Sequence, residues 1–442
     1  MYFAKFGIGS PRTRGDRIRR ALLVLGVACT TGMAGAQESA LTDAKDKAKQ
    51  TPTSPDAAFT YGRALRRAGR ETDALNELRR GQAFAQGPTA VKLTWEVART
   101  YIAKRDFQHA MATCRGMQRL TNANAASHAC AAEAHLLWRR GSEAMTEIAE
   151  VNKLKDVPAD VSYAVKVAEG RARELESKEG DAEVAYREAI KLAADRPDAH
   201  MLLGVMLHRL AKEGLPSLKK AVELDPHDPV AQLELGRAYP VGGADAIGAF
   251  EKAVAERPTY TDALRSLTEA YLAAKRIPDA KKTAEAVLKI APNDVYSRIA
   301  QGRVALAEGR ADDALKEGET AVKAMPNEGK AKLLVADAYA KKNEVDLALE
   351  AYQAAYGLDH GDPAPLVNAT YACIAAGRNT SAKAFARRAT VDFANHAPAW
   401  IALGDALAAD KEKAAAKTAY ESAKKARDVD VAAVDKKIAN LK

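Results

Sequence analysis

A short pattern recurs along almost the whole chain, and it constrains the fold more than any other feature. One position of the pattern holds a small residue, and the intervals between successive copies are 36, 36, 36, 34, 32, 32, 34, 34, 34 and 34 residues. A fixed period of roughly 20–50 residues is typical of stacked units, so we expect an elongated array rather than several separate domains. The small residues are Gly62, Ala98, Ala134, Gly170, Gly204, Gly236, Thr268, Gly302, Ala336, Thr370 and Gly404.

Each unit of the pattern predicts two amphipathic helices joined by a turn. Long tracts of Ala, Leu, Glu, Lys and Arg favour helix, and an alanine follows most of the small residues after twelve positions. A glycine inside a helix costs about 0.5–1 kcal/mol relative to alanine, so its recurrence at one phase indicates that two backbones approach closely there. Turn signals separate the helices at 68–70, 308–310 and 376–378. The fold class expected is all-α.

The period and the small positions resemble the tetratricopeptide repeat (TPR) family. The resemblance implies an α-solenoid of about eleven helical hairpins over residues 54–428, wound as a right-handed superhelix whose first helices line the concave surface. The best-matched units centre on Gly302, with Ala314, Ala321 and Pro326, and on Gly404, with Trp400 and Leu407.

The first 36 residues predict a secretory signal peptide. A basic segment ends at Arg19-Arg20, an apolar stretch follows at 21–28, and small residues lead to Ala36, after which we expect cleavage. Two alternatives remain open: lipidation at Cys29, and a twin-arginine signal at Arg19-Arg20. The expected location is therefore the periplasm or envelope, and the mature chain contains no apolar run long enough to cross a bilayer.

Two short segments flank the array. Residues 37–53 show little periodicity and are expected to form a flexible leader. Residues 429–442 carry an apolar stripe formed by Val431, Val434, Ile438 and Leu441, which predicts a capping helix. A solenoid needs such a cap because its last unit would otherwise expose an apolar face.

No pattern in the chain indicates catalysis, a metal site or a cofactor. The repeats leave no room for a separate catalytic domain, and the common zinc-protease, serine-hydrolase, phosphate-loop and Cys-x-x-Cys motifs are missing. His128 and His135 are seven residues apart, too far for a shared metal without further ligands. We therefore expect a non-enzymatic protein without cofactors.

The positive net charge does not predict nucleic-acid binding. The whole chain carries +9, of which residues 1–36 hold six basic residues and one acidic residue, so the remainder carries +4. An exported chain with this small charge is not expected to bind nucleic acid.

Cys114 and Cys130 lie eight residues before and eight after Asn122, which falls in a turn between two helices. If these helices pack antiparallel, the two thiols stand at the same height, and a disulfide can form in an oxidising compartment. The alternative is two buried thiols that act as small apolar groups.

The concave groove is expected to be basic in its first third. In the resemblance, the residue after each small one points into the groove, and five of the first eight are arginines. Residues 37–140 carry 17 basic and 10 acidic residues, a net charge of +7. Arginine binds carboxylates through paired hydrogen bonds, and tryptophan offers a flat contact surface. The candidate groove residues are Arg63, Arg66, Arg67, Lys92, Trp95, Arg99, His135, Trp138, Arg139 and Arg171.

These residues suit a protein or peptide of acidic character, and an anionic glycan is the second choice. A solvated helix face with ordinary aromatic packing is the alternative interpretation of the same pattern. The function expected is an exported scaffold that binds a partner in the groove. The main alternative is an accessory factor of an envelope export or polysaccharide-secretion system, and a third is an enzyme subunit or protease adaptor.

Overall fold

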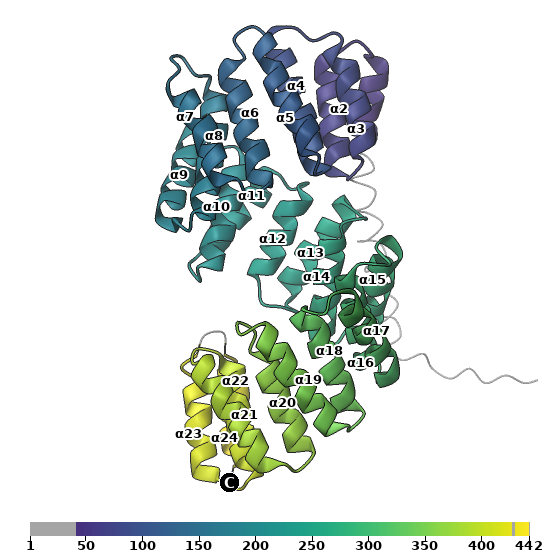
Figure 1. The fold of residues 1–442 in the computed structure, drawn as a ribbon, viewed down its shortest axis with the longest axis vertical. Coiled ribbons are helices and arrows are strands. Elements are labelled where there is room, and N and C mark those ends of the chain that lie inside the picture. Colours follow the sequence, from purple (N-terminus) through teal and green to yellow (C-terminus); the bar gives the residue numbers. More distant parts are fainter. Residues whose placement is uncertain (1–40, 427–428, 442) are drawn as a thin grey trace, which may run out of the picture. The chain divides into compact units, whose positions relative to one another are not determined.

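The computed structural model describes residues 41–426 and 429–441, and within them the chain forms consecutive antiparallel helical hairpins (Figure 1). The chain divides into two compact units after Tyr260. Unit 1 ends at Tyr260 and unit 2 begins at Thr261, so the division falls between two hairpins. The expected all-α solenoid of eleven hairpins is confirmed in the described residues.

Unit 1 contains six hairpins. Their helices are α2 (Pro55–Arg67) with α3 (Glu71–Gln82), α4 (Gly87–Ala103) with α5 (Phe107–Gly116), α6 (Asn124–Leu137) with α7 (Gly141–Asn152), α8 (Ala159–Leu175) with α9 (Glu179–Leu192), α10 (Pro197–Arg209) with α11 (Leu215–Leu224), and α12 (Pro229–Ala238) with α13 (Ala244–Glu256). A 3₁₀ turn, η1 (Met117–Arg119), follows α5.

Unit 2 contains five hairpins and one final helix. The helices are α14 (Thr261–Ala273) with α15 (Ile277–Ile290), α16 (Val295–Ala307) with α17 (Ala311–Ala324), α18 (Gly329–Lys341) with α19 (Val345–Leu358), α20 (Ala364–Ala375) with α21 (Asn379–Asp392), α22 (Ala397–Ala409) with α23 (Lys413–Ala423), and α24 (Val431–Ala439).

The small residue of each hairpin lies where the two helices approach most closely. A Cβ atom placed on Gly62 would stand 2.5 Å from Cγ of Leu78, sixteen residues on, and one on Gly236 would stand 2.5 Å from Cε1 of Phe250, fourteen residues on. The shorter offset belongs to a repeat whose interval is 32 residues, because its inter-helix segment is two residues shorter. The steric reason inferred for the recurring glycines is confirmed.

Threonine takes the small position in two hairpins. Thr268 and Thr370 are completely buried, and each hydroxyl donates to the backbone carbonyl four residues earlier, Leu264 and Leu366, at 2.8 Å. This bond satisfies the hydroxyl inside its own helix, so a buried polar side chain is tolerated at the helix–helix contact.

The two flanking segments differ in how well the sequence predicted them. Residues 41–50 are helical and Ala48 is buried, so these residues do not form the expected unstructured leader. Leu41, Ala44 and Ala48 give this helix one covered face, a spacing too short to stand out in the sequence. At the other end, α24 buries Val434 against the last hairpin, and Nζ of Lys437 lies 2.8 Å from Oδ1 of Asp405 in α22.

The predicted signal peptide, with Cys29 and the cleavage point after Ala36, lies outside the described residues. Within the residues that the structure does describe, no helix is both long enough and apolar enough to span a membrane.

Candidate partner-binding cavity

Unit 1 encloses a cavity of about 1640 Å³. Its walls come mainly from the first helices of the six hairpins, α2, α4, α6, α8, α10 and α12, together with the ends of α11 and α13. This is the surface on which the sequence placed the candidate groove residues. The cavity lies entirely within unit 1.

Seven of the ten predicted residues line this cavity together: Arg63, Arg66, Arg67, Lys92, Trp95, Arg99 and Arg171. The other three, at the end of α6, do not. The His135 ring is buried 5.7 Å from the ring of Phe107, and the Trp138 ring packs 4.8 Å from the same phenylalanine. Arg139 adopts a positive φ of 55° in the turn that follows. The small-residue phase of the third hairpin therefore directs these side chains toward hairpin packing instead of the cavity.

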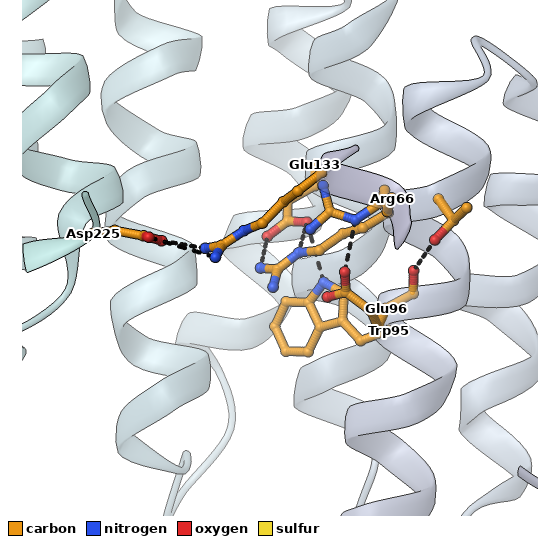
Figure 2. A network of polar contacts seen from close by, with 8 residues as sticks. Arg66, Trp95, Glu96, Glu133 and Asp225 are labelled. Carbon is orange, nitrogen blue, oxygen red and sulfur yellow. Dashed lines mark hydrogen bonds and ion pairs between the residues drawn. The ribbon is translucent and has the colours of Figure 1, made fainter. Parts of the chain in front are cut away.

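Two of the predicted arginines are engaged by carboxylates of the next hairpin. Nε of Arg66 donates to Oε1 of Glu96 at 2.6 Å, and Arg99 donates to both oxygens of Glu133 at 3.0 and 2.7 Å (Figure 2). Glu96 is almost completely buried. Burial alone would raise the pKa of Glu96, but the charges of Arg66, Arg99 and Arg63 outweigh it and hold that pKa below its usual value.

Trp95 is only 7% exposed and is not a free platform for a ligand. Its indole Nε1 donates to Oε2 of Glu133 at 3.1 Å, and the Arg99 guanidinium lies 5.1 Å from the ring centroid. Trp95 therefore orients Glu133 and Arg99, while part of its surface borders the cavity.

Three cavity cations remain without an ion pair among the described residues: Arg63, Lys92 and Arg171. The ammonium of Lys92 lies 4.2 Å from the ring centroid of Phe59. Burial and the positive charges of Arg67 and Arg66 lower the pKa of Arg63, despite the opposing charge of Glu96. Because positive charge is disfavoured at Arg63, an incoming anion would relieve the repulsion around it.

The cavity wall is balanced in charge, which the sequence analysis missed. Besides the six predicted cations, Arg196 and Arg257 line it, and these eight basic residues face eight acidic ones. A signal existed: Glu133 lies 34 residues after Arg99, one repeat interval on, at the groove phase. The acidic residues are Asp56, Glu96, Glu133, Asp160, Asp195, Asp198, Asp225 and Asp228.

The first hairpin also contacts the fifth and sixth hairpins of unit 1. Arg67 in α2 is paired with Asp225 at the end of α11, and Nη2 of Arg257, after α13, lies 3.3 Å from Oε1 of Glu71 in α3 (Figure 2). Between them lies Gly69, which has a φ of +74° and where a Cβ would stand 2.7 Å from Nε of Arg257. Only glycine combines this backbone conformation with room for the arginine.

A disulfide joins Cys114 in α5 to Cys130 in α6, with the Cα atoms 5.4 Å apart. The hydroxyl of Ser127 donates to the carbonyl of Cys114 at 2.8 Å, within the same contact. The bond therefore crosses from the second hairpin to the third, whose first helices carry Arg99 and Glu133. Cys373 is a buried free thiol in unit 2.

No group of three or more His, Cys, Asp or Glu side chains in the described part of the chain is arranged to hold a metal ion. The fold and the cavity thus define the class of molecule: an all-α helical-repeat protein with an enclosed, charge-lined groove.

Comparison with known families makes the class more specific. Two profiles described as tetratricopeptide repeat match residues 243–303 and 299–363. The chain is therefore a tetratricopeptide repeat protein, with the matched repeats spanning the sixth to ninth hairpins.

Solved structures of similar architecture were found at low sequence identity. Yeast Tom70 aligns over 88% of this chain and 95% of its own, at 13% identity and a TM-score of 0.46. The APC/C hetero-tetramer Cut9–Hcn1 gives 87%, 90%, 16% and 0.40 for the same quantities. A thermophilic TPR protein of Thermus thermophilus gives 40%, 99%, 22% and 0.36. A search of curated proteins found no significant sequence match.

Proposed function

We propose that this protein is a non-enzymatic scaffold that binds a segment of a partner polypeptide in the cavity of unit 1. The observation that carries the proposal is the size and lining of that cavity. At about 1640 Å³ it exceeds the roughly 300–1,000 Å³ typical of small-molecule sites, and it is lined by apolar and charged side chains together. Tetratricopeptide repeats are typical of proteins that bind other proteins, which supports the same choice.

The segment carries acidic groups that meet Arg63, Lys92 and Arg171. These three cations have no ion pair among the described residues, whereas Arg66 and Arg99 are already engaged. Arginine recognises a carboxylate through two parallel hydrogen bonds, so Arg63 and Arg171 supply direction as well as charge. The acidic residues of the same wall favour a segment that also carries basic or amide groups.

The protein acts outside the cytoplasm, in the periplasm or attached to the envelope. The basic, apolar and small-residue order of residues 1–36 supports export, and the disulfide between Cys114 and Cys130 fits an oxidising compartment. Mass spectrometry of protein from its native host should give an N-terminus at Gln37 without acyl chains. An acyl-modified Cys29 would place the protein on a membrane surface instead, and an intact Met1 would refute export.

Peptide binding is tested with an array of 12-residue peptides of graded Asp and Glu content, beside anionic oligosaccharides. We expect acidic peptides to bind, with affinity that falls as salt rises because ionic contacts are screened beyond about 8 Å at physiological ionic strength. Retention of the oligosaccharides alone would favour the polysaccharide-secretion alternative. Binding of neither would refute the proposal.

The site is tested by neutralising its three unpaired cations. The triple variant Arg63→Gln, Lys92→Gln and Arg171→Gln should weaken peptide binding at least ten-fold. The matched control removes the same charge from three cations of unit 2 that also have no ion pair among the described residues, at Lys289, Lys323 and Lys341. Equal weakening by both triple variants would indicate general electrostatic attraction without a defined site.

A further inference from the structure

Unit 1 closes on itself across a long stretch of chain. Arg67 and Asp225 are 158 residues apart, and Glu71 and Arg257 are 186 residues apart, yet each pair is in contact. Arg67, Asp225 and Arg257 all line the cavity. The first hairpin and the last two hairpins of unit 1 therefore meet at the cavity wall and complete it.

The closing contact differs in kind from the contacts between neighbouring hairpins. Neighbours share apolar cores, and one such core runs continuously from Leu75 in α3 to Ala172 in α8. The closing contact contains two ion pairs whose side chains are 15–30% exposed. Nε of Arg257 is buried there without a hydrogen-bond partner, so the contact is also imperfectly satisfied.

Such a contact is easily broken. Partly exposed ion pairs shift an equilibrium by a factor of roughly 1.5 to 5 each, and salt weakens them further. An apolar core between neighbouring hairpins is far stronger, so the closing contact is the weakest link around the cavity.

We propose that these residues form an ion-pair clasp, made by Arg67 with Asp225 and by Arg257 with Glu71, which opens to admit a linear polypeptide segment and closes around it. The occupant rests on the proposed function, whereas the opening and closing do not. With the clasp closed, a chain can enter only by a free end. With the clasp open, an internal segment between two folded domains can enter sideways.

The opening is measured without any partner, as a distance across the clasp. Spin labels are attached to the full chain through Asn76→Cys in α3 and Lys252→Cys in α13, both exposed positions, in a background with Cys29→Ser and Cys373→Ala. Pulsed electron resonance should show one short distance at low salt, and a second, longer one that grows as salt is raised.

Charge reversal tests the two ion pairs directly. Arg67→Glu with Arg257→Glu should raise the ratio of open to closed molecules about 2- to 25-fold at low salt, from the factors above. The matched control is Arg70→Glu with Arg237→Glu, which reverses two arginines of the same two hairpins that pair within their own segments, with Asp73 and Glu234. It should leave the distances unchanged. Exchanging the charges, Arg67→Asp with Asp225→Arg, should restore the closed distance. Distances that respond to neither salt nor reversal would overturn the clasp.

Encirclement is tested by locking the clasp. Arg67→Cys and Asp225→Cys are joined by a bis-maleimide linker, and binding is measured for a fluorescein-labelled 12-residue Glu-rich peptide, either with free ends or with a folded protein fused at each end. The locked protein should bind the free-ended peptide, but the doubly blocked one at least ten-fold more weakly than the unlocked protein does. Equal binding of both probes would overturn sideways entry through the clasp. If neither probe binds even the unlocked protein, the proposed function fails, and the distance measurement still decides whether the clasp opens.

Discussion

Replacing Gly236 by alanine tests the steric argument for the recurring small residues. A Cβ at this position would stand 2.5 Å from Cε1, 2.6 Å from Cδ1 and 3.0 Å from Cζ of Phe250. The phenyl ring is 4% exposed and is held in the core of its hairpin. Since real Cβ atoms do not approach carbon so closely, either the ring or the α12 backbone has to move.

The net effect of Gly236→Ala is the difference of two terms. Overpacking a core typically costs about 1–3 kcal/mol. Alanine regains about 0.5–1 kcal/mol that glycine loses inside a helix. We therefore expect a net loss of about 0.5–2 kcal/mol in the free energy of unfolding of unit 1.

The same hairpin contains its own control. Gly248 lies in the middle of α13, and nothing stands within 4 Å of a Cβ placed there, so Gly248→Ala should gain about 0.5–1 kcal/mol. Urea titrations followed by circular dichroism compare the unfolding midpoints of both variants with the parent chain. The steric reasoning is refuted if Gly236→Ala raises the midpoint as much as Gly248→Ala does.

Three further predictions follow from individual contacts. Asp337→Asn should stabilise unit 2 at pH 7, because burial raises the pKa of Asp337 and its ionised form is disfavoured in the folded state; the advantage should shrink as pH falls toward the unfolded value of about 3.9, which urea melts at pH 7 and pH 4 would detect. The asparagine keeps Oδ1, the atom that accepts both hydrogen bonds, so a loss of stability at pH 7 would contradict the argument. Reducing the disulfide between Cys114 and Cys130 should lower the stability of unit 1 by about 2–4 kcal/mol, in line with its 16-residue separation, and a double Cys→Ala variant should no longer respond to reductant. Deleting residues 431–442 should expose the surface that covers Val434 and cause self-association, visible by light scattering; a monomeric truncation with an unchanged melting temperature would show that α24 is not a cap.

The repeat architecture could be predicted from sequence because its cause is local. A small residue and an alanine twelve positions later are needed within one hairpin, and the same need arises in every hairpin, so ten intervals report one steric fact. The alanines at this second position, such as Ala182 and Ala280, are completely buried, as that argument requires. The helix at 41–50 was missed because it is a single short segment that repeats nothing.

The charges of the candidate site were predicted only in part. Arg63 and Lys92 could be placed on the groove by phase, but the partners of Arg99 and Arg67 could not both be found in this way. Glu133 was within reach because it lies one repeat from Arg99. Asp225 was not, because its approach to Arg67 depends on the summed rotation of five hairpins, which no local pattern encodes.

This difference between short-range and long-range pairs bears on how many repeats the molecule can contain. Pairs such as Arg99 with Glu133, or Glu269 with Arg303, refer only to the adjacent hairpin, so they survive the gain or loss of a whole unit elsewhere. The approach of α2 to the end of α11 does not: one hairpin more or fewer between them displaces Asp225 by a full step. In unit 1 the closing contact thus measures the number of hairpins, and an excision of α8 and α9 would leave every remaining hairpin intact while separating the ends.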